Sequence, residues 1–141
     1  MKSNPLVGTW RLKSLETRAS DGSVSFPYGK RVVGYAVLSS EGYFCVAIMN
    51  AERKMFSSND IKGGSTAERA DAEDSYLSYA GPCTVEDSKF RVKVEVSLFP
   101  NWIGTTQERS YEIEGKTLSV VSSPVIAYGK EQRGYLIFER V

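Results

Sequence analysis

The chain has 141 residues, 41% of them hydrophobic, which suits one domain that builds its own core. Its 18 Lys and Arg are interspersed with 17 Asp and Glu, so we expect no basic surface for nucleic acid. The sequence contains no histidine, which excludes Ser-His-Asp triads and histidine-bound zinc. It also lacks an apolar run typical of a signal peptide or a membrane span, and we expect a cytoplasmic protein without a membrane partner.

Strand patterns begin close to the amino terminus. Residues 8–18 alternate in polarity, and residues 31–39 and 43–50 flank the turn Ser40-Glu41-Gly42. Because glycine supplies the positive φ of a tight hairpin, we expect the two strands beside this turn to be antiparallel neighbours. The segment Phe26-Pro27-Tyr28-Gly29 has the composition of a loop that carries two aromatic rings.

One helix is predicted, over residues 66–78. The segment Ser65-Thr66-Ala67-Glu68 matches a capping box, and the alanine- and charge-rich run that follows is expected to end at Gly81-Pro82. The apolar positions of this run are weakly patterned. We therefore expect the helix to lie against one side or end of the sheet and outside the core.

The clearest alternation lies in the second half of the chain, at residues 90–99. The face expected to be buried consists of Phe90, Val92, Val94, Val96 and Leu98. Further strands are expected at 83–86, 105–114, 117–122 and 132–140. With the strands at 8–18, 31–39, 43–50 and 90–99, the expected strands number eight. The first and the last of them can pair with each other, which predicts a closed barrel whose interior holds side chains or one small ligand.

Several segments resemble the lipocalin-like domain family of bacteria and fungi, a branch of the calycin-type barrels. The segments are LVGTWRL, FPYG with the following Gly34-Tyr35, AIMNAER, YLSYAG, VEVSLFPNWIGT and the terminal YLIFERV. The resemblance implies an all-β, up-and-down, antiparallel eight-stranded barrel with one short helix and an apolar pocket, as a single domain over residues 1–141. Some members of the family that this chain resembles are in turn similar to proteins encoded beside natural-product pathways, so the resemblance leaves the function open.

Two features of the chain are interpreted through this resemblance. Trp10 and Arg140 match the calycin arrangement in which a first-strand Trp packs across the closed barrel end beneath a last-strand Arg, a structural contact. Similar sequences often carry histidines in the strand that leads into SLFPNW, where this chain has Val92 and Lys93. Histidine-dependent chemistry in such relatives is therefore absent here or replaced by Lys93.

Aromatic residues supply the candidate ligand site. The loop at 99–103 can cover the barrel mouth as a lid or fill the barrel as a plug, and the loop at 26–28 is similar in composition. Tyrosine combines an apolar ring with a polar group, which suits aromatic ligands. The candidate ligand-binding residues are Phe26, Tyr28, Tyr35, Tyr43, Tyr79, Phe99 and Trp102.

Arg109 and Tyr111 are the candidate catalytic residues, because we expect their face of the strand to point inward. Lys93 and Glu95 share a face that could point either way, and the apolar residues opposite them favour the outward direction. The cysteines Cys45 and Cys83 are expected to be reduced and buried.

Two main functions remain open at this stage. The chain can bind a small hydrophobic or aromatic metabolite, or it can be an isomerase or cyclase that acts on such a compound. A packed barrel used as an interaction module is a third interpretation. We expect no metal and no nicotinamide or flavin cofactor, since the sequence lacks the corresponding ligand clusters and glycine-rich loop. Monomer and homodimer are both compatible with the sequence.

Overall fold

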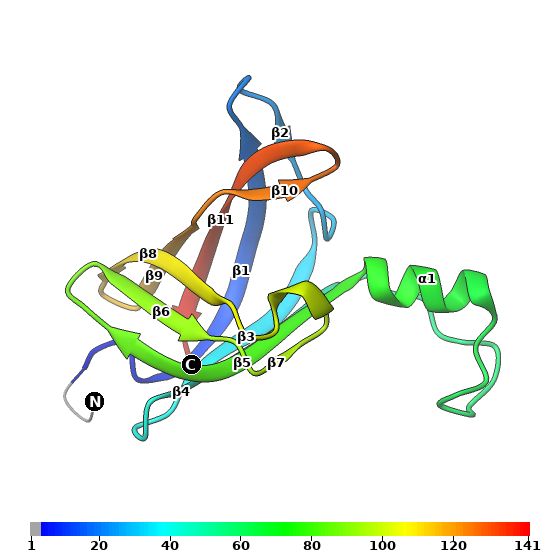
Figure 1. Ribbon diagram of the computed structural model, residues 1–141, viewed down its shortest axis with the longest axis horizontal. Coiled ribbons are helices and arrows are strands. Elements are labelled where there is room, and N and C mark those ends of the chain that lie inside the picture. The colour runs from blue at the N-terminus through cyan, green and yellow to red at the C-terminus, as the bar shows by residue number, and fades with distance from the viewer. Residues whose placement is uncertain (1–3) are drawn as a thin grey trace.

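The computed structural model describes residues 4–141 and forms a closed antiparallel β-barrel (Figure 1). The eight barrel strands are β1 (Gly8–Ala19), β3 (Val32–Leu38), β4 (Tyr43–Asn50), β5 (Tyr76–Val85), β6 (Lys89–Lys93), β8 (Thr106–Glu114), β9 (Thr117–Ser122) and β11 (Lys130–Arg140). Each strand pairs with the next in this order, and β11 returns to pair with β1. The predicted all-β, eight-stranded barrel is thereby confirmed.

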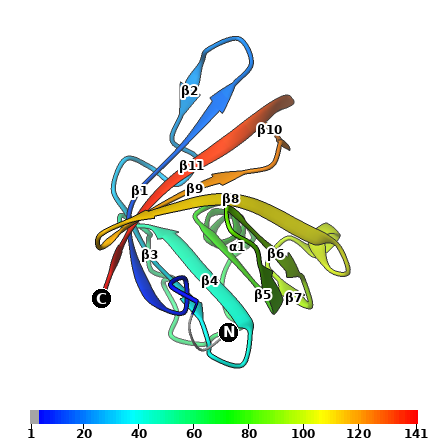
Figure 2. The ribbon, with the colours of Figure 1, turned by 90° about the vertical axis from the view of Figure 1, so that its left-hand side faces the viewer.

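Three short strands and two helical segments complete the chain. They are β2 (Val24–Ser25), β7 (Val96–Ser97), β10 (Val125–Ala127), the α-helix α1 (Thr66–Asp74) and the 3-10 helix η1 (Pro100–Trp102). Figure 2 shows how β2 and β10 extend the sheet beside β1 and β11 at one end of the barrel. No helix in the described part of the chain is long and apolar enough to cross a membrane.

The barrel closes where the first strand meets the last. The pairing of β1 with β11 runs from Trp10 opposite Arg140 to Ala19 opposite Gln132, with one irregularity between Leu12 and Ser14. The predicted Trp10–Arg140 contact is present, since the Arg140 guanidinium carbon lies 4.1 Å from the centroid of the Trp10 ring. This end of the barrel is the closed end.

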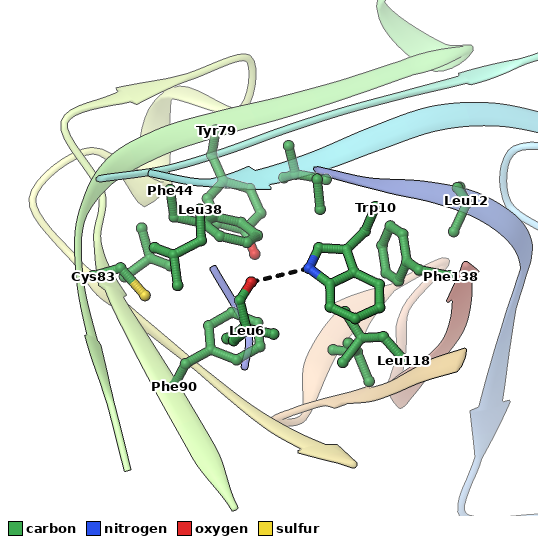
Figure 3. Packing of buried hydrophobic residues seen from close by; sticks show 14 of the residues in the cluster. Leu6, Trp10, Leu12, Leu38, Phe44, Tyr79, Cys83, Phe90, Leu118 and Phe138 are labelled. Carbon is green, nitrogen blue, oxygen red and sulfur yellow. Dashed lines mark hydrogen bonds between the residues drawn. The ribbon is translucent and has the colours of Figure 1, made fainter. Parts of the chain in front are cut away.

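Buried side chains from all sides of the barrel pack around Trp10 (Figure 3). The indole Nε1 of Trp10 donates a hydrogen bond to the Leu6 carbonyl oxygen at 2.9 Å, so its polar atom has a partner in the core. Phe44 packs between Tyr79 and Phe90, with ring centroids 6.0 and 5.3 Å away. The alternation along these strands has thus placed the apolar side chains around Trp10 inside the barrel.

The helix begins where the sequence predicts but ends earlier. Its capping box is present, since the Ser65 hydroxyl accepts from the Glu68 N–H at 3.2 Å and the Glu68 carboxylate accepts from the Ser65 N–H at 3.0 Å. The helix ends at Asp74, and the predicted extension to Ser78 is wrong because the chain from Tyr76 onward pairs with β4. The segment Gly81-Pro82 therefore lies within a strand. Figure 1 shows α1 projecting beside the barrel.

The strand predicted over residues 90–99 is broken after Lys93. Gly81 lies opposite the break, and a Cβ atom there would come within 1.9 Å of the Lys93 carbonyl oxygen. Only a glycine allows so close an approach of the two backbones. The break reverses the alternation, so Val94 is buried whereas Val96 is 65% exposed, and the prediction of a buried Val96 is wrong.

The position of each charged or thiol side chain in the barrel wall determines whether it is buried or exposed. Lys93 and Glu95 are exposed and point outward. Both cysteines are free thiols; Cys83 is buried, whereas Cys45 is exposed on the outer face of β4. The expectation that Cys45 is buried is therefore wrong.

Candidate functional site

The barrel encloses a cavity of about 690 Å³. Its floor is formed by Trp10 and its neighbours at the closed end, and it reaches the surface at the opposite end, where the exposed residues Phe99 and Ile126 belong to its lining. We call this open end the mouth. Volumes of 300–1,000 Å³ are typical of small-molecule sites.

The floor and most of the wall are apolar. The buried apolar residues that line the cavity include Leu6, Trp10, Ala36, Leu38, Phe44, Val46, Ile48, Phe90, Leu118, Val120 and Phe138. They come from strands all around the barrel, because the inward position of each strand alternates with an outward one. This part of the cavity suits an apolar ring and offers it little hydrogen bonding.

One stretch of the wall is polar and crosses four neighbouring strands. Thr17 lies opposite Gly134, and Arg109 lies opposite Ser122. The Gly134 N–H donates to the Ser122 hydroxyl oxygen at 2.7 Å, which links the two pairs. Gln107, two residues before Arg109 on β8, also faces the cavity. We call Thr17, Gln107, Arg109 and Ser122 the polar strip; each of them is less than 10% exposed.

Arg109 is the charged member of the polar strip, and its residue is only 6% exposed. Its Nη1 donates to the Glu108 carbonyl oxygen at 3.0 Å and to the Gln107 amide oxygen at 3.4 Å. Its guanidinium carbon lies 5.6 Å from the Tyr79 ring centroid and 5.9 Å from that of Trp102. Within residues 4–141 no carboxylate forms an ion pair with this side chain.

Aromatic side chains surround the mouth. Trp102 packs edge to face on Tyr79, with ring centroids 5.4 Å apart, and Phe99 packs on Trp102 at 5.9 Å. Tyr28 enters the lining from the loop between β2 and β3. Burial raises the pKa of the Tyr28 phenol to about 12, so this group is neutral at ordinary pH. The loop that bears Trp102 lies in the cavity wall and leaves the interior open.

The structure thus brings together five of the sequence-predicted site residues on one cavity. They are Tyr28, Tyr79, Phe99, Trp102 and Arg109. Sequence reasoning missed Thr17, Gln107 and Ser122, although Gln107 shares the inward alternation of Arg109. No local signal marks Ser122, whose position follows from the register between β8 and β9.

Four other predicted site residues lie off the cavity. Tyr35 and Tyr43 point outward and are 44% and 57% exposed, because Gly34, Ala36 and Phe44 take the inward positions beside them. These two tyrosines, predicted as ligand-binding residues, therefore lie outside the cavity.

The other two predicted site residues that lie off the cavity are Phe26 and Tyr111. Phe26 is exposed on its loop, with the Lys30 ammonium 5.5 Å from its ring centroid. Tyr111 packs its ring on Phe90 at 5.9 Å and donates its hydroxyl to the Glu86 carbonyl oxygen at 3.0 Å. The hydroxyl of Tyr111 is thus held at the turn between β5 and β6, outside the cavity lining.

A closed eight-stranded antiparallel barrel with an internal cavity that opens at one end is the architecture of the lipocalin-like proteins. Residues 7–141 match the family model described as the lipocalin-like domain, and the chain belongs to this family. The resemblance stated from the sequence is confirmed.

Individual proteins similar to this chain include one relative and two solved structures. The chain is 40% identical over 91 residues to the 4'-hydroxy-3'-methoxypropiophenone carrier protein ppsC of Aspergillus oryzae (strain ATCC 42149 / RIB 40), a match that covers 58% of this chain and 82% of that protein. A lipocalin-like protein from Bacteroides uniformis ATCC 8492 matches with 13% identity and a TM-score of 0.49, over 98% of this chain and 100% of that one. An uncharacterized protein from Bacteroides eggerthii DSM 20697 matches with 16% identity and a TM-score of 0.47, over 96% of this chain and 99% of that one.

Proposed function

We propose that this protein binds one small, largely apolar aromatic metabolite inside its barrel and carries it in solution. The observation that carries the proposal is the cavity of about 690 Å³, which has an apolar floor and an aromatic mouth. Burying an aromatic ring against such a floor contributes most of the free energy of binding, and the few polar groups on the wall fix its orientation.

The relative from Aspergillus oryzae supports the same conclusion. Its name describes a carrier for a phenolic aryl ketone, a compound with one aromatic ring and several oxygen substituents. A ligand of this kind matches the division of the cavity into an apolar floor and a polar strip. We therefore propose aryl ketones and related phenols as the first ligand class to test.

An isomerase or cyclase remains the second candidate, and Arg109 is the observation that favours it. A buried guanidinium beside the substrate can stabilise a developing enolate. Proton transfer is harder to assign, because Tyr111 is turned away and the phenol of Tyr28 is held neutral by its raised pKa. Glu73 is the carboxylate in the described lining, and it lies at the mouth. The geometry supports binding better than proton transfer at the floor.

Titration with 4'-hydroxy-3'-methoxypropiophenone and with the uncharged probe N-phenyl-1-naphthylamine tests the proposal. We expect saturable binding at one site per chain, measured by calorimetry, and a change in tryptophan fluorescence, because Trp102 lies in the wall. In Trp102→Phe the fluorescence change should fall to the part that Trp10 at the floor contributes, while calorimetry still shows binding. Tyr43→Phe, on the outer face, is the matched control. Absence of saturable binding of both compounds would refute the proposal, and conversion of the ketone during incubation would favour the enzyme.

A further inference from the structure

We propose that the ligand presents an ionised oxygen to Arg109, so that the cavity selects the anion of an aromatic acid, such as a carboxylate, a phenolate or an enolate. The inference rests on the proposed function, since it names the chemical class of the molecule bound in the same cavity. It begins from the environment of the Arg109 side chain.

The charge of Arg109 is buried without a compensating anion. A buried cation is normally paired, because its transfer out of water costs several kcal/mol. The groups that contact its guanidinium in the described chain are neutral: the Gln107 amide, the Glu108 carbonyl and the rings of Tyr79 and Trp102. The two rings hold the guanidinium in place and offset part of the cost. An anion in the cavity would complete the pairing.

The carboxylate next to Arg109 in the sequence, that of Glu108, pairs with residues on the outside of the barrel. Glu108 directly precedes Arg109 but points to the outer face, where it pairs with Arg91 at 2.8 Å and with Lys89 at 3.6 Å. The alternation of β8 keeps its carboxylate on the opposite side of the sheet from Arg109. The carboxylate next to Arg109 in the sequence is thus paired on the outside of the barrel, and the guanidinium of Arg109 faces the cavity without it.

The hydrogen bonds of Arg109 leave room for a ligand. A guanidinium has five N–H donors arranged to meet two oxygens of a planar acid. In residues 4–141 only Nη1 has hydrogen-bond partners, so Nε and Nη2 remain for a ligand. The hydroxyl oxygen of Ser122 already accepts from Gly134, which leaves its own hydrogen as a further donor across the strip. Donors without a competing carboxylate favour an acceptor-rich, negatively charged group.

Two naphthalene probes of similar size separate charge from shape: 2-naphthoate, which is an anion, and 2-acetylnaphthalene, which is neutral. Since hydrogen bonds to charged groups are the stronger ones, we expect the anion to bind roughly tenfold to hundredfold more tightly at neutral pH. Arg109→Met should remove this preference, because it should weaken the binding of the anion far more than that of the ketone. Arg91→Met, on the outer face of β6, is the matched control and should keep the preference.

Two further measurements exclude a merely structural role for Arg109. Removing an unpaired buried charge should leave the melting temperature of Arg109→Met equal to or above that of the wild type, whereas a structural arginine would lower it. With a phenolic probe such as 4-hydroxyacetophenone, the phenolate absorption band should grow on binding to the wild type at a pH below the phenol pKa, and not on binding to Arg109→Met.

The outcomes are distinguishable from failure of the proposed function. If neither naphthalene compound binds, the cavity is not a ligand site and the proposed function fails. If both bind equally and Arg109→Met changes neither, the proposed function stands and the selection of anions is refuted.

A second inference comes from the outside of the barrel and is independent of the cavity. The outward-facing residues of β3, β4, β5 and β7 are uncharged along four adjacent strands. They are Val33, Tyr35, Val37, Tyr43, Cys45, Ala47, Met49, Ser78, Ala80, Pro82 and Val96. We call this surface the outer patch, and we infer that it pairs with the outer patch of a second copy of this chain.

In contrast to the outer patch, the outer face of the other half of the barrel carries charged residues. The outward positions of β8 and β11 carry Glu108, Glu112, Glu131, Arg133 and Glu139. A solvated sheet face normally has such polar residues, whereas a large apolar patch on a soluble protein marks an interaction site.

The exposed apolar side chains of the outer patch can form the centre of an interface. Tyr35 and Tyr43 are 44% and 57% exposed, which leaves on the order of 200 Å² on these two rings alone. Val37 and Val96 are 38% and 65% exposed and extend the patch on either side of Cys45. A standard interface covers about 800 Å² per partner, with an apolar centre and a polar rim. The patch supplies such a centre.

The charges at the two borders of the patch favour a second copy as the partner. Arg11 lies at the β1 border, with its guanidinium 5.6 Å from the Tyr35 ring centroid. Glu95 lies at the opposite border, where it lines a shallow groove with Tyr43 and Val96. A two-fold axis parallel to the strands would place each Arg11 border over the Glu95 border of the other copy, so the patch is complementary to itself.

Analytical ultracentrifugation over a wide concentration range tests this inference. We expect a dimer in the wild type, a monomer in Val37→Lys and an unchanged dimer in Glu112→Lys, the control on the charged face. Arg11→Glu should weaken the dimer, and the double variant Arg11→Glu with Glu95→Arg should restore it. Circular dichroism verifies that each variant is folded. A wild type that stays monomeric, or a dimer that survives Val37→Lys, would refute the inference.

Discussion

The guanidinium of Arg140 lies over the indole of Trp10, 4.1 Å from the ring centroid, and joins the last strand of the barrel to the first. The same guanidinium donates to the carbonyl oxygen of Val7 at 3.1 Å and to that of Pro5. The amino-terminal segment is thereby held across the closed end. This contact holds the closed end of the barrel together.

Trp10→Ala should lower the free energy of unfolding by about 3–5 kcal/mol, because it removes a large side chain that is only 1% exposed. Urea denaturation followed by circular dichroism measures the change. Trp102→Ala, at the mouth, should lower the free energy of unfolding clearly less than Trp10→Ala does. If Trp10→Ala kept the stability of the wild type, Trp10 would line the cavity without holding the closed end together, and its structural assignment would be wrong.

Gly81→Ala should destabilise the barrel, since the new methyl group would lie 1.9 Å from the Lys93 carbonyl oxygen. Relieving this overlap requires the backbones to separate at the break between β6 and β7, and overpacking of this kind costs about 1–3 kcal/mol or more. The matched control is Gly134→Ala, whose added Cβ would meet its nearest atom, the Ser122 hydroxyl oxygen, at 3.4 Å. In thermal denaturation, the melting temperature of Gly81→Ala should be well below that of Gly134→Ala. Equal melting temperatures would contradict the close approach at Gly81.

The barrel itself could be predicted from the sequence because its strands differ in polarity between their two faces. Phe90, Val92 and Val94 alternate with charged residues, and the alternation correctly predicts which side is buried. The same reasoning placed Arg109 on the inner face of β8 and Lys93 on the outer face of β6.

Where both faces of a strand are apolar, this signal disappears. In β3, the outward Val33, Tyr35 and Val37 are as apolar as the inward Ala36 and Leu38, so periodicity could not show that Tyr35 points outward. The end of the helix and the break after Lys93 depend on pairing with β4 and on the contact at Gly81. Both are long-range contacts that local sequence does not contain.

The two thiols should react at very different rates. Burial raises the pKa of the Cys83 thiol to about 11, so little of it is present as the reactive thiolate at neutral pH, whereas Cys45 is exposed. In dilute native protein, Ellman's reagent should label one thiol quickly, and Cys45→Ser should abolish this fast phase. In urea both thiols should react. Because Cys45 lies in the outer patch, the fast phase should slow as the protein concentration rises; a second fast thiol in Cys45→Ser would contradict the burial of Cys83.

Tyr28 should make the barrel less stable in alkali. Burial at the mouth, together with the nearby Tyr128, Glu73 and Asp74, raises the pKa of its phenol from 10.0 to about 12. Above pH 10 the phenol ionises in the unfolded chain but stays protonated in the folded barrel, so the folded state binds more protons and stability falls as the pH rises toward 12.

The test for Tyr28 compares urea midpoints across this alkaline range for the wild type, Tyr28→Phe and Tyr43→Phe. Tyr28→Phe should lose less stability than the wild type as the pH rises, because it lacks the buried phenol. Tyr43→Phe removes an exposed phenol and should follow the wild-type curve. If Tyr28→Phe and the wild type declined in parallel, the Tyr28 phenol would titrate alike in the folded and unfolded states, and its burial at the mouth would be refuted.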